Sequence, residues 1–595
     1  MVTQKLKDMR RKMPAKASGE IKTVTVKVTQ KNGDIYVYER NVQYQPQDRK
    51  TVIHGSRLIG KIPKGSKKMI KTRPKRPAGC KMREETENLT ASRTRIGMMR
   101  IIEHIGKVSG IDMAIYGSMD EGTAEKIISI GRYLFATGGN SLTHIENWQY
   151  THPLPYVHGI TEDIYHSLFS ELGINEEYQQ RFFHKWGEQF DEDDSLAFDS
   201  TTESTYSNNI IDAQYGFNKD QDGLKTIKLL TLYSINKRLP VHFTKQPGYI
   251  SDITSLGSAL AQMEAIGIKI KEVITDNGFY SNQNLAMMFL AGFDFITLVK
   301  TSLTWIKPLI DEKMKELEQI TTLYPGDMKT HGVCVTVMHS FEKTRKYANH
   351  KTGASKGEEE TFERRVYVHI YFNRSRQTEE IDAFDRDVLA VKQLIEAGTP
   401  VTDLKPGAQD IVKNYFTIRK WGSKVTVTID IKKMEDTYKH MGYFVLVSNS
   451  NKDSFECLEK YRKREWVENF FASWGQNADG NRPRVHDSDT LRGKLFVQFI
   501  SLCYYEFFAN RIREIKAELK EEVKAAADGN GKKKEAALAQ SLLAWMEKKT
   551  NMQMLQWFDM VEEITVSSPL HNKRWNTEVS ARDQLFLTRL GVTLG

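Results

Sequence analysis

Residues 461–471, Tyr-Arg-Lys-Arg-Glu-Trp-Val-Glu-Asn-Phe-Phe, decide how the whole chain is interpreted. The stretch contains neither proline nor glycine, so its pattern predicts a helix. At about 100° per residue, Tyr461, Arg464 and Glu468 lie within about 60° of one another, whereas the apolar side chains point to the opposite side. One face therefore carries a phenol, a guanidinium and a carboxylate in a row. Taken alone, this face is more typical of a solvated helix whose Arg464 and Glu468 form an ion pair.

Two further stretches place an aspartate where a short apolar run ends. The first is Ser195-Leu-Ala-Phe-Asp199, and the second is Lys271-Glu-Val-Ile-Thr-Asp276. Each run predicts a buried strand, and small or turn-forming residues follow each aspartate. Carboxylates from two strand ends and one helix can converge on a hard divalent cation. For each aspartate alone, the alternative is a turn residue or a helix cap.

Together these residues carry a resemblance to a known family. Asp199, Asp276 and Glu468 occur in this order, with Asp-x-Gly-Phe-Tyr beginning at Asp276 and Tyr-x2-Arg-x3-Glu ending at Glu468. The two motifs are specific when they occur together, and they resemble the DDE transposases of the IS4 group, within them the IS1634-like branch. The resemblance covers roughly residues 190–510 well and the flanks more loosely. The segment Arg57–Ile62 also resembles this branch.

The resemblance implies a metal-dependent DNA transposase of the cut-and-paste type. Such an enzyme binds double-stranded DNA at terminal inverted repeats, cleaves at the ends of the insertion sequence and transfers the strands into target DNA, as a homodimer on paired ends. The resemblance makes Asp199, Asp276 and Glu468 the catalytic residues and the ligands of Mg²⁺, for which Mn²⁺ can substitute. Two such ions about 3.5–4 Å apart can activate the nucleophile and stabilise the leaving oxygen. Two alternatives stay open: a domesticated, non-catalytic DNA-binding protein, and a metal-dependent nuclease without strand transfer.

The family signature also implies that Tyr461 and Arg464 bind DNA. A phenol can donate a hydrogen bond to a phosphate, and a guanidinium can donate two. Family members usually carry a lysine seven residues after the glutamate, where this chain has Gly475. Because glycine is favoured just past a helix end, we expect the helix to stop at Gly475 and Arg464 to be its main phosphate contact. Arg482 and Arg484 are candidates for the missing contact.

Two tryptophans are candidates for contact with an unpaired base. Some relatives form a DNA hairpin on the excised end, aided by a tryptophan that stacks on an extruded base. Trp305 and Trp421 lie in the corresponding insertion of this chain. Stacking on a base is one interpretation, and packing in a core is the more common role of tryptophan.

The composition limits the class of protein. The chain has 595 residues, enough for about four domains, and its formal net charge of +10 favours a polyanionic partner. The four cysteines show no Cys-x-x-Cys spacing, which indicates neither a zinc site nor a disulfide framework. The N-terminus lacks an apolar signal region, and no run of about 18 apolar residues predicts a membrane span. These features favour a reducing interior and no membrane partner, and the resemblance implies a cytoplasmic, nucleoid-associated protein of the bacterial type.

Residues 1–95 predict a basic N-terminal DNA-binding module. Residues 21–28 and 35–38 alternate like strands, with the hairpin signal Asn32-Gly33 between them. Residues 50–83 include no acidic side chain, which favours an arm that contacts DNA phosphates; the alternative is a disordered linker. The expected DNA-binding residues of this arm are Lys61, Lys64, Lys67, Lys68, Lys71, Arg73, Lys75 and Arg76.

The predicted fold class is α/β, with a ribonuclease-H-like catalytic core, a β-rich insertion, and flanking basic and helical segments. Three strands followed by alternating helices and strands indicate the core. The resemblance implies that its first and fourth strands are neighbours, which places Asp199 near Asp276. The expected limits are 1–95 for the basic module, 96–190 for a helical DNA-binding or linker domain, 191–300 for the first part of the core, 301–440 for the insertion, 441–515 for the second part with the glutamate helix, and 516–595 for a C-terminal helical region. The helices of residues 96–190 form either a helix-turn-helix unit or plain packing around the core, and both readings stay open.

Overall fold

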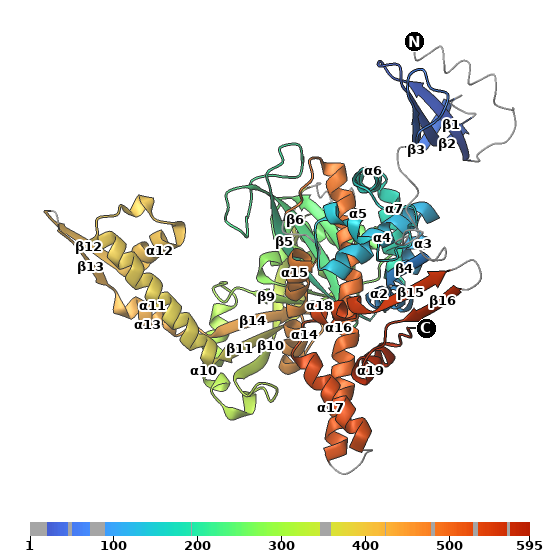
Figure 1. Cartoon of the computed structure of the whole chain (residues 1–595). Coiled ribbons are helices and arrows are strands. Elements are labelled where there is room, and N and C mark those ends of the chain that lie inside the picture. Colours follow the sequence, from blue (N-terminus) through green and yellow to red (C-terminus); the bar gives the residue numbers. More distant parts are fainter. Residues whose placement is uncertain are drawn as a thin grey trace, which may run out of the picture. The chain divides into compact units, whose positions relative to one another are not determined.

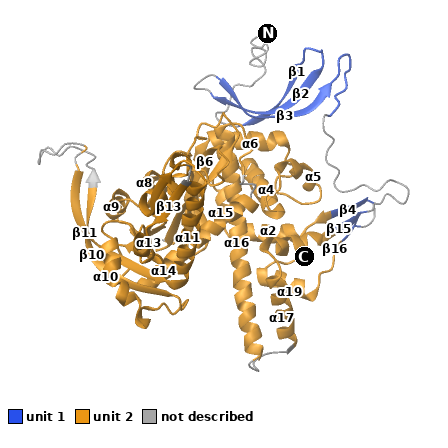
Figure 2. Ribbon diagram, turned by 90° about the vertical axis from the view of Figure 1, so that its left-hand side faces the viewer, with its two compact units in different colours: residues 1–93, 564–574 blue, residues 94–563, 575–595 orange. Residues whose placement is uncertain are grey.

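The chain forms two compact units, shown in Figures 1 and 2. Unit 1 contains residues 1–93 and 564–574, and unit 2 contains residues 94–563 and 575–595. The computed structural model describes residues 21–45, 50–71, 90–191, 193–344, 357, 359–422, 424–477, 482–527, 533–567 and 572–594.

Unit 1 contains an antiparallel sheet in the order β1-β2-β3. Its strands are β1 (Lys22–Thr29), β2 (Ile35–Gln45) and β3 (Lys50–Ile62). The predicted hairpin between the first two strands is confirmed, and Gly33 supplies the positive φ of 89° that its turn requires. Residues 50–62, the first part of the predicted basic arm, form a strand, which excludes a disordered linker for this part. They pair with β2 along its length, because their β-branched residues suit a sheet.

A second small sheet has the order β16-β15-β4. Its strands are β4 (Thr90–Arg95), β15 (Glu562–Ser567) and β16 (Asn572–Asn576). The helices predicted near the C-terminus are present as α17 (Lys533–Glu547), α18 (Asn551–Trp557) and α19 (Ala581–Leu590). The sequence pattern does not predict β15 and β16, which are short and half-buried or exposed.

The centre of unit 2 is an eight-stranded sheet in the order β10-β11-β14-β9-β8-β5-β6-β7. Its strands are β5 (Ser195–Thr205), β6 (Lys225–Ser234), β7 (Leu239–Pro247), β8 (Glu272–Thr275), β9 (Asp294–Val299), β10 (Thr330–Thr344), β11 (Glu359–Asn373) and β14 (Tyr443–Ser448). The first three are antiparallel neighbours, β8 lies parallel to β5 on its other side, and β9 lies parallel to β8. This is the strand order of a ribonuclease-H-like core, so the predicted fold class is confirmed.

The connections of the core also follow the predicted pattern, with one difference. α8 (Asp252–Ile266) and α9 (Asn282–Ala291) lead to β8 and β9, and the hydroxyls of Ser251 and Ser281 cap their first turns. The first strand was predicted to end at Asp199, and this prediction is wrong. It continues to Thr205, because residues 200–205 keep the antiparallel register with β6 that places Asp199 opposite Thr231.

The long interval between β9 and β14 contributes to two structures. β10 and β11 extend the central sheet beyond β14. The rest forms α11 (Arg374–Glu396), α12 (Pro406–Tyr415), the hairpin β12 (Phe416–Trp421) and β13 (Lys424–Ile429), and α13 (Ile431–Tyr438), drawn in yellow in Figure 1. These elements share a small core of their own, formed by Val391, Ile395, Leu404, Val412 and Val427.

A helical layer packs around the 40-residue helix α16 (Ser488–Ala527). It contains α2 (Gly97–Val108), α3 (Ile111–Tyr116), α4 (Glu121–Thr137), α6 (Glu162–Ile174) and α7 (Glu176–Gly187). Where α6 crosses α16, a Cβ on Gly173 would lie 1.9 Å from the Asp489 carbonyl oxygen, and one on Gly493 2.0 Å from that of Phe169. Gly173 lies inside α6, one residue before its end, and permits close contact of the two backbones. None of the helices in the described ranges is long and apolar enough to cross a membrane.

Candidate active site

The first two predicted carboxylates lie side by side in the central sheet. In the parallel pairing of β5 with β8, Phe198 is opposite Thr275. The next residues are Asp199 and Asp276, so both side chains project from neighbouring strands at the same level. Asp276 directly follows β8 and precedes the short 3-10 helix η2 (Asn277–Phe279). The two aspartates are thus neighbours, as the predicted topology required.

Arg464 connects Asp199 with Glu468, and Tyr461 binds Asp276. Its Nη1 donates a hydrogen bond to Oδ2 of Asp199 over 2.9 Å, and its Nη2 donates to Oε1 of Glu468 over 2.6 Å. The Tyr461 hydroxyl donates to Oδ1 of Asp276 over 3.3 Å. The Arg464 guanidinium also lies 5.6 Å from the centre of the Tyr461 ring. The structure therefore brings all five predicted residues into one polar network, which we call the acidic network.

The stretch that carries three of these residues is two helices rather than one. α14 (Ser454–Arg462) ends before Arg464, and α15 (Glu465–Asn477) begins after it. Between the two helices the backbone hydrogen bonds join residues three positions apart, as in a 3-10 turn. The Arg464 N–H donates to the Tyr461 carbonyl, and the Val467 N–H donates to the Arg464 carbonyl, each over 2.9 Å. The prediction of one helix is wrong because spacing alone shows nothing of tertiary contacts. The bonds that Arg464 makes to two carboxylates fix a tight turn here.

α15 also runs further than predicted. It continues through Gly475 to Asn477, so the prediction that it stops at Gly475 is wrong. The helix buries four apolar residues, and their packing offsets the cost of about 0.5–1 kcal/mol for a glycine inside a helix. These residues are Val467, Phe470, Phe471 and Trp474. At about 100° per residue, Gly475 lies within about 20° of Glu468 on the helix surface.

Burial changes the acid–base properties of the acidic network. Desolvation raises the pKa of Asp199 to about 6, against the attraction of Arg464, and the negative charges of Asp276 and Glu468 add to the rise. Arg464 is only 9% exposed. Burial opposes its charge, but the surrounding phenol and carboxylates outweigh this effect and raise the pKa of Arg464. The charged guanidinium therefore offsets the repulsion among the carboxylates.

The donor set has the right chemistry for a hard divalent cation, because carboxylate oxygens are the ligands that Mg²⁺ prefers. Within the described ranges, however, no three His, Cys, Asp or Glu side chains lie close enough together to hold a metal ion. The Nε of Arg464 is buried and has no hydrogen-bond partner in the described part of the chain. To hold a cation between them, Asp199, Asp276 and Glu468 would therefore have to move closer together.

Asp252 and Lys228 support Asp199, and the sequence analysis missed both. The backbone N–H of Ser200 donates to Oδ1 of Asp199, and its hydroxyl donates to Oδ1 of Asp252, each over 2.8 Å. Lys228, 4% exposed, donates to the same Asp252 oxygen over 2.7 Å. The available signal was a lysine inside the mainly apolar stretch of residues 227–232. A buried lysine in such a strand requires a carboxylate partner.

The predicted DNA contacts of the basic arm lie in unit 1. Lys61 forms an ion pair with Asp34, with 2.7 Å between Nζ and Oδ2. Four lysines in the segment after β3 are exposed, namely Lys64, Lys67, Lys68 and Lys71. Three predicted contacts fall outside the described residues, namely Arg73, Lys75 and Arg76. Contact between the arm and DNA stays a prediction.

The candidate substitutes for the missing lysine lie beyond the end of α15. Arg482 forms an ion pair with Asp222 over 3.1 Å, and its guanidinium lies 4.7 Å from the centre of the Tyr206 ring. Arg484 has a left-handed backbone with φ 49°. A phosphate contact by either arginine stays a prediction.

The two tryptophans of the insertion differ in environment. The indole N–H of Trp305 donates to the Tyr280 hydroxyl over 3.2 Å, and its ring lies 4.2 Å from that of His339. Trp305 is thus partly buried and packs against the core of the central sheet. Trp421 is 91% exposed at the end of β12, and its stacking on a base stays a prediction.

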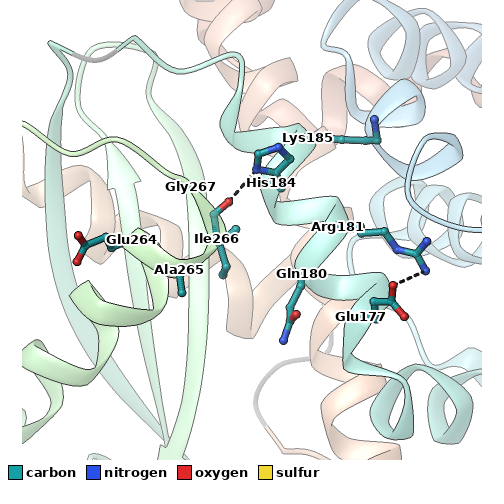
Figure 3. A pocket seen from close by; sticks show the side chains of 9 residues that line it. All are labelled: Glu177, Gln180, Arg181, His184, Lys185, Glu264, Ala265, Ile266 and Gly267. Carbon is teal, nitrogen blue, oxygen red and sulfur yellow. Dashed lines mark hydrogen bonds and ion pairs between the residues drawn. The ribbon is translucent and has the colours of Figure 1, made fainter.

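A surface hollow of about 400 Å³ lies between α7 and α8 (Figure 3). Its lining includes both acidic and basic side chains, and the His184 ring donates to the Ile266 carbonyl over 2.8 Å. The lining residues are Glu177, Gln180, Arg181, His184, Lys185, Glu264, Ala265, Ile266 and Gly267. The hollow includes no residue of the acidic network, so the two are separate features.

The sheet and the acidic network define a ribonuclease-H-like protein with a carboxylate site. The chain belongs to the family described as Transposase DDE domain, which matches residues 191–504, more than half of the 595 residues. A comparison with curated proteins gives no match. Among solved structures, the chain is similar to piggyBac transposase in a synaptic complex with hairpin DNA. The identity is 8%, 77% of each chain is covered, and the TM-score is 0.33.

Proposed function

We propose that this chain is a cut-and-paste DNA transposase that cleaves DNA at the ends of its insertion sequence and joins the freed 3′-hydroxyls to target DNA. One observation carries the proposal. Asp199 on β5 and Asp276 directly after the neighbouring strand β8 stand at the same level, and Arg464 links Asp199 to Glu468. In a chain of this family, such a set of carboxylates is suited to phosphodiester chemistry.

Each residue of the acidic network has a role in this proposal. Asp199, Asp276 and Glu468 hold the divalent ions, Mg²⁺ or in its place Mn²⁺. When bound, these ions activate the attacking oxygen and stabilise the leaving one. Tyr461 positions Asp276 through its hydrogen bond. Arg464 binds carboxylates through a planar fork that equally suits a phosphate, so a DNA phosphate competes with Asp199 and Glu468 for it.

The finer assignments rest on the two sequence motifs. Asp-x-Gly-Phe-Tyr at Asp276 and Tyr-x2-Arg-x3-Glu at Glu468 favour the IS4 group and its IS1634-like branch. The proposed partners are double-stranded DNA with terminal inverted repeats, target DNA, and a second copy of the chain on the paired ends. The proposed place of action is the nucleoid of a bacterial cytoplasm, where such DNA lies.

The experiment uses the full chain with labelled DNA that carries the inverted repeats flanking its gene, in Mg²⁺ and in Mn²⁺. We expect cleavage at the repeat ends and joining to a supercoiled plasmid. Replacing Asp199, Asp276 or Glu468 individually by Ala should abolish both reactions and leave end binding largely intact.

Three outcomes separate the proposal from its alternatives. Cleavage without any joining would identify a nuclease without strand transfer. Binding without cleavage in either metal would identify a domesticated DNA-binding protein. Normal cleavage by all three Ala variants would show that the site lies elsewhere.

A further inference from the structure

The connection between β5 and β6 exposes three aromatic rings to solvent. We call residues 206–224 the aromatic loop. Tyr206 is 72% exposed, Tyr215 70% and Phe217 75%, and Tyr249, which follows β7, is 63% exposed. Single exposed apolar residues are ordinary, but a group of large rings on one surface marks a binding site.

The backbone beneath these rings is fixed. A Cβ on Gly216 would lie 2.0 Å from the Gly248 carbonyl oxygen and 2.9 Å from the Tyr249 Cα, so the two segments touch. This contact places Tyr215 and Phe217, on either side of Gly216, next to Tyr249. Gln214 and Thr226 exchange two backbone hydrogen bonds of 3.1 and 2.9 Å. The rings are therefore presented by a rigid support rather than by a loose loop.

The segment that follows the glutamate helix holds the other side of the loop. The Ser207 hydroxyl donates to the His486 carbonyl over 2.9 Å, and the Ile211 N–H donates to the Ser488 hydroxyl over 2.9 Å. The aromatic loop is thus tied to the segment that leads into α16, after the helix that carries Glu468.

Cations border the rings, and the acidic side chains of the loop are paired. Arg482 lies over Tyr206, and the Lys225 ammonium lies 5.9 Å from the centre of the Tyr215 ring. Asp222 forms an ion pair with Arg482. Asp212 likewise forms an ion pair with Lys245, and Lys219 and Asp220 are both exposed. These two ion pairs neutralise two of the three loop carboxylates and their cations. Lys219 and Lys225 against Asp220 then leave net positive charge beside the π-faces, which suits a polyanion with aromatic groups.

The loop lies close to the acidic network. The backbone N–H of Lys219 donates to the Thr202 hydroxyl over 3.1 Å, and Thr202 follows Asp199 by three residues along β5, with its side chain on the opposite face of the sheet. Three strand residues span about 10 Å. A DNA strand advances about 3.4 Å per nucleotide, so this distance corresponds to about three nucleotides.

We propose that the aromatic loop and Tyr249 bind unpaired bases of the DNA strand that leaves the acidic network, by stacking the bases on Tyr206, Tyr215 and Phe217. The inference deepens the proposed function and rests on it. Every base has a π-face, so such a surface binds without sequence preference, and the neighbouring cations bind the phosphates between the bases.

The test measures binding to two forms of the same end DNA, with the metal replaced by Ca²⁺ so that cleavage does not interfere. One form ends as a blunt duplex at the cleavage position, and the other continues as a three-nucleotide unpaired tail that contains 2-aminopurine. The wild-type chain should bind the tailed form more tightly, and stacking should quench the 2-aminopurine fluorescence.

Substitutions in the aromatic loop distinguish the effect of the aromatic rings from that of the rest of the loop. Tyr215→Ala with Phe217→Ala should weaken binding of the tailed form by about fivefold to a hundredfold and remove the quenching. Binding of the blunt form should not change, which also shows that the variant is folded. Tyr215→Phe keeps the ring and should behave like the wild type. Ile211→Ala is the matched control, because Ile211 is 79% exposed in the same loop and has no π-face.

Distinct outcomes overturn the inference or the proposed function. Equal losses on both DNA forms, or normal quenching by the double Ala variant, would overturn the stacking surface. A loss with Ile211→Ala, together with a lower oligomeric mass, would assign the patch to a second copy of the chain. A wild-type chain that cleaves and joins DNA but shows no ring-dependent tail binding refutes only the inference. Ring-dependent tail binding without cleavage or joining refutes only the proposed function.

Discussion

Arg464 donates a hydrogen bond of 2.9 Å to Asp199, a residue 265 positions earlier in the chain. The bond closes the site, because Asp199 belongs to the first core strand and Arg464 to the turn before the glutamate helix. The same guanidinium binds Glu468, so one side chain holds together two of the three candidate metal ligands. Arg464 is thus a structural link, and in the proposed function a metal ion competes with it for the two carboxylates, whereas a DNA phosphate competes with the carboxylates for its guanidinium.

Replacing Arg464 by Ala should have two effects. A charged hydrogen bond to phosphate is worth about 1.5–3 kcal/mol, so end binding should weaken about tenfold to a hundredfold. Asp199 then stays buried without its partner, so the free energy of unfolding should fall by about 3 kcal/mol. This value is near the low end for a broken buried ion pair, because the other partner, Glu468, is half-exposed. Titration of labelled end DNA and chemical denaturation measure the two effects. Arg464→Lys keeps the charge but not the planar fork, so it should retain only part of the DNA affinity and of the stability. An Arg464→Ala protein with unchanged affinity and stability would contradict the role of Arg464 as a link between the carboxylates.

Replacing Gly475 by Lys should strengthen end binding. Because α15 continues through Gly475, a lysine there projects from the same face as Glu468 and can contact a phosphate, a gain of roughly tenfold. Gln476→Lys is the matched control, because it adds the same charge about 100° away on the helix surface. Equal gains from both variants, in the same DNA titration, would mean that only net charge matters.

The four exposed lysines of unit 1 test the basic arm. Changing Lys64, Lys67, Lys68 and Lys71 to Gln should flatten the dependence of DNA affinity on salt. The slope of log K against log salt should decrease by about 0.9 for each lysine that contacts a phosphate. The measurement is a titration of duplex DNA at several salt concentrations. An unchanged slope would assign these lysines to a solvated surface.

The crossing of α6 and α16 depends on a glycine. In Gly493→Ala the added Cβ would meet the Phe169 carbonyl, which is backbone and cannot rotate away, so the free energy of unfolding should fall by about 1–3 kcal/mol. Gly407→Ala is the control, because a Cβ on Gly407 of α12 has nothing within 4 Å. That variant should be neutral or slightly more stable. Chemical denaturation compares the two, and equal stabilities would mean that the helices can shift apart at little cost.

Much of the core could be predicted from the sequence, because its strands are continuous apolar runs of ordinary length. The runs at β5 and β8 and the caps at Ser251 and Ser281 are local signals, and the structure contains the predicted elements. The prediction that Asp199 lies next to Asp276 has a different source. It follows from the strand order that the resemblance implied, not from any property of either stretch.

The features that could not be predicted depend on contacts between distant residues. The turn at Arg464 contains no proline or glycine, and only its bonds to Asp199 and Glu468 distinguish it from a helix interior. Gly173 follows the pattern of a helix end, yet the backbone of α16 is what requires a glycine there. In both cases the local pattern was ambiguous, and packing decided between the two interpretations.

Glu506 of α16 should make the stability of the protein depend on pH. The side chain is buried and accepts a hydrogen bond of 3.0 Å from the Tyr233 hydroxyl. Burial raises its pKa from 4.5 to about 7, against that hydrogen bond and the charge of Arg513. In the unfolded chain the carboxyl ionises near pH 4.5, whereas in the folded protein it stays neutral until about pH 7. Between these values the folded state binds more protons, so the free energy of unfolding falls as the pH rises.

Replacing Glu506 by Gln removes the ionisation and keeps an acceptor for Tyr233. The variant and the wild type should be similar in stability near pH 4.5, and the variant should become more stable by roughly 3 kcal/mol at pH 7.5, since each unit of pKa shift corresponds to about 1.4 kcal/mol. Chemical denaturation at several pH values measures the difference. Glu514→Gln, on the same helix but 61% exposed, is the control and should show no such trend. A difference between wild type and Glu506→Gln that is constant across this range would mean that Glu506 is already charged in the folded protein.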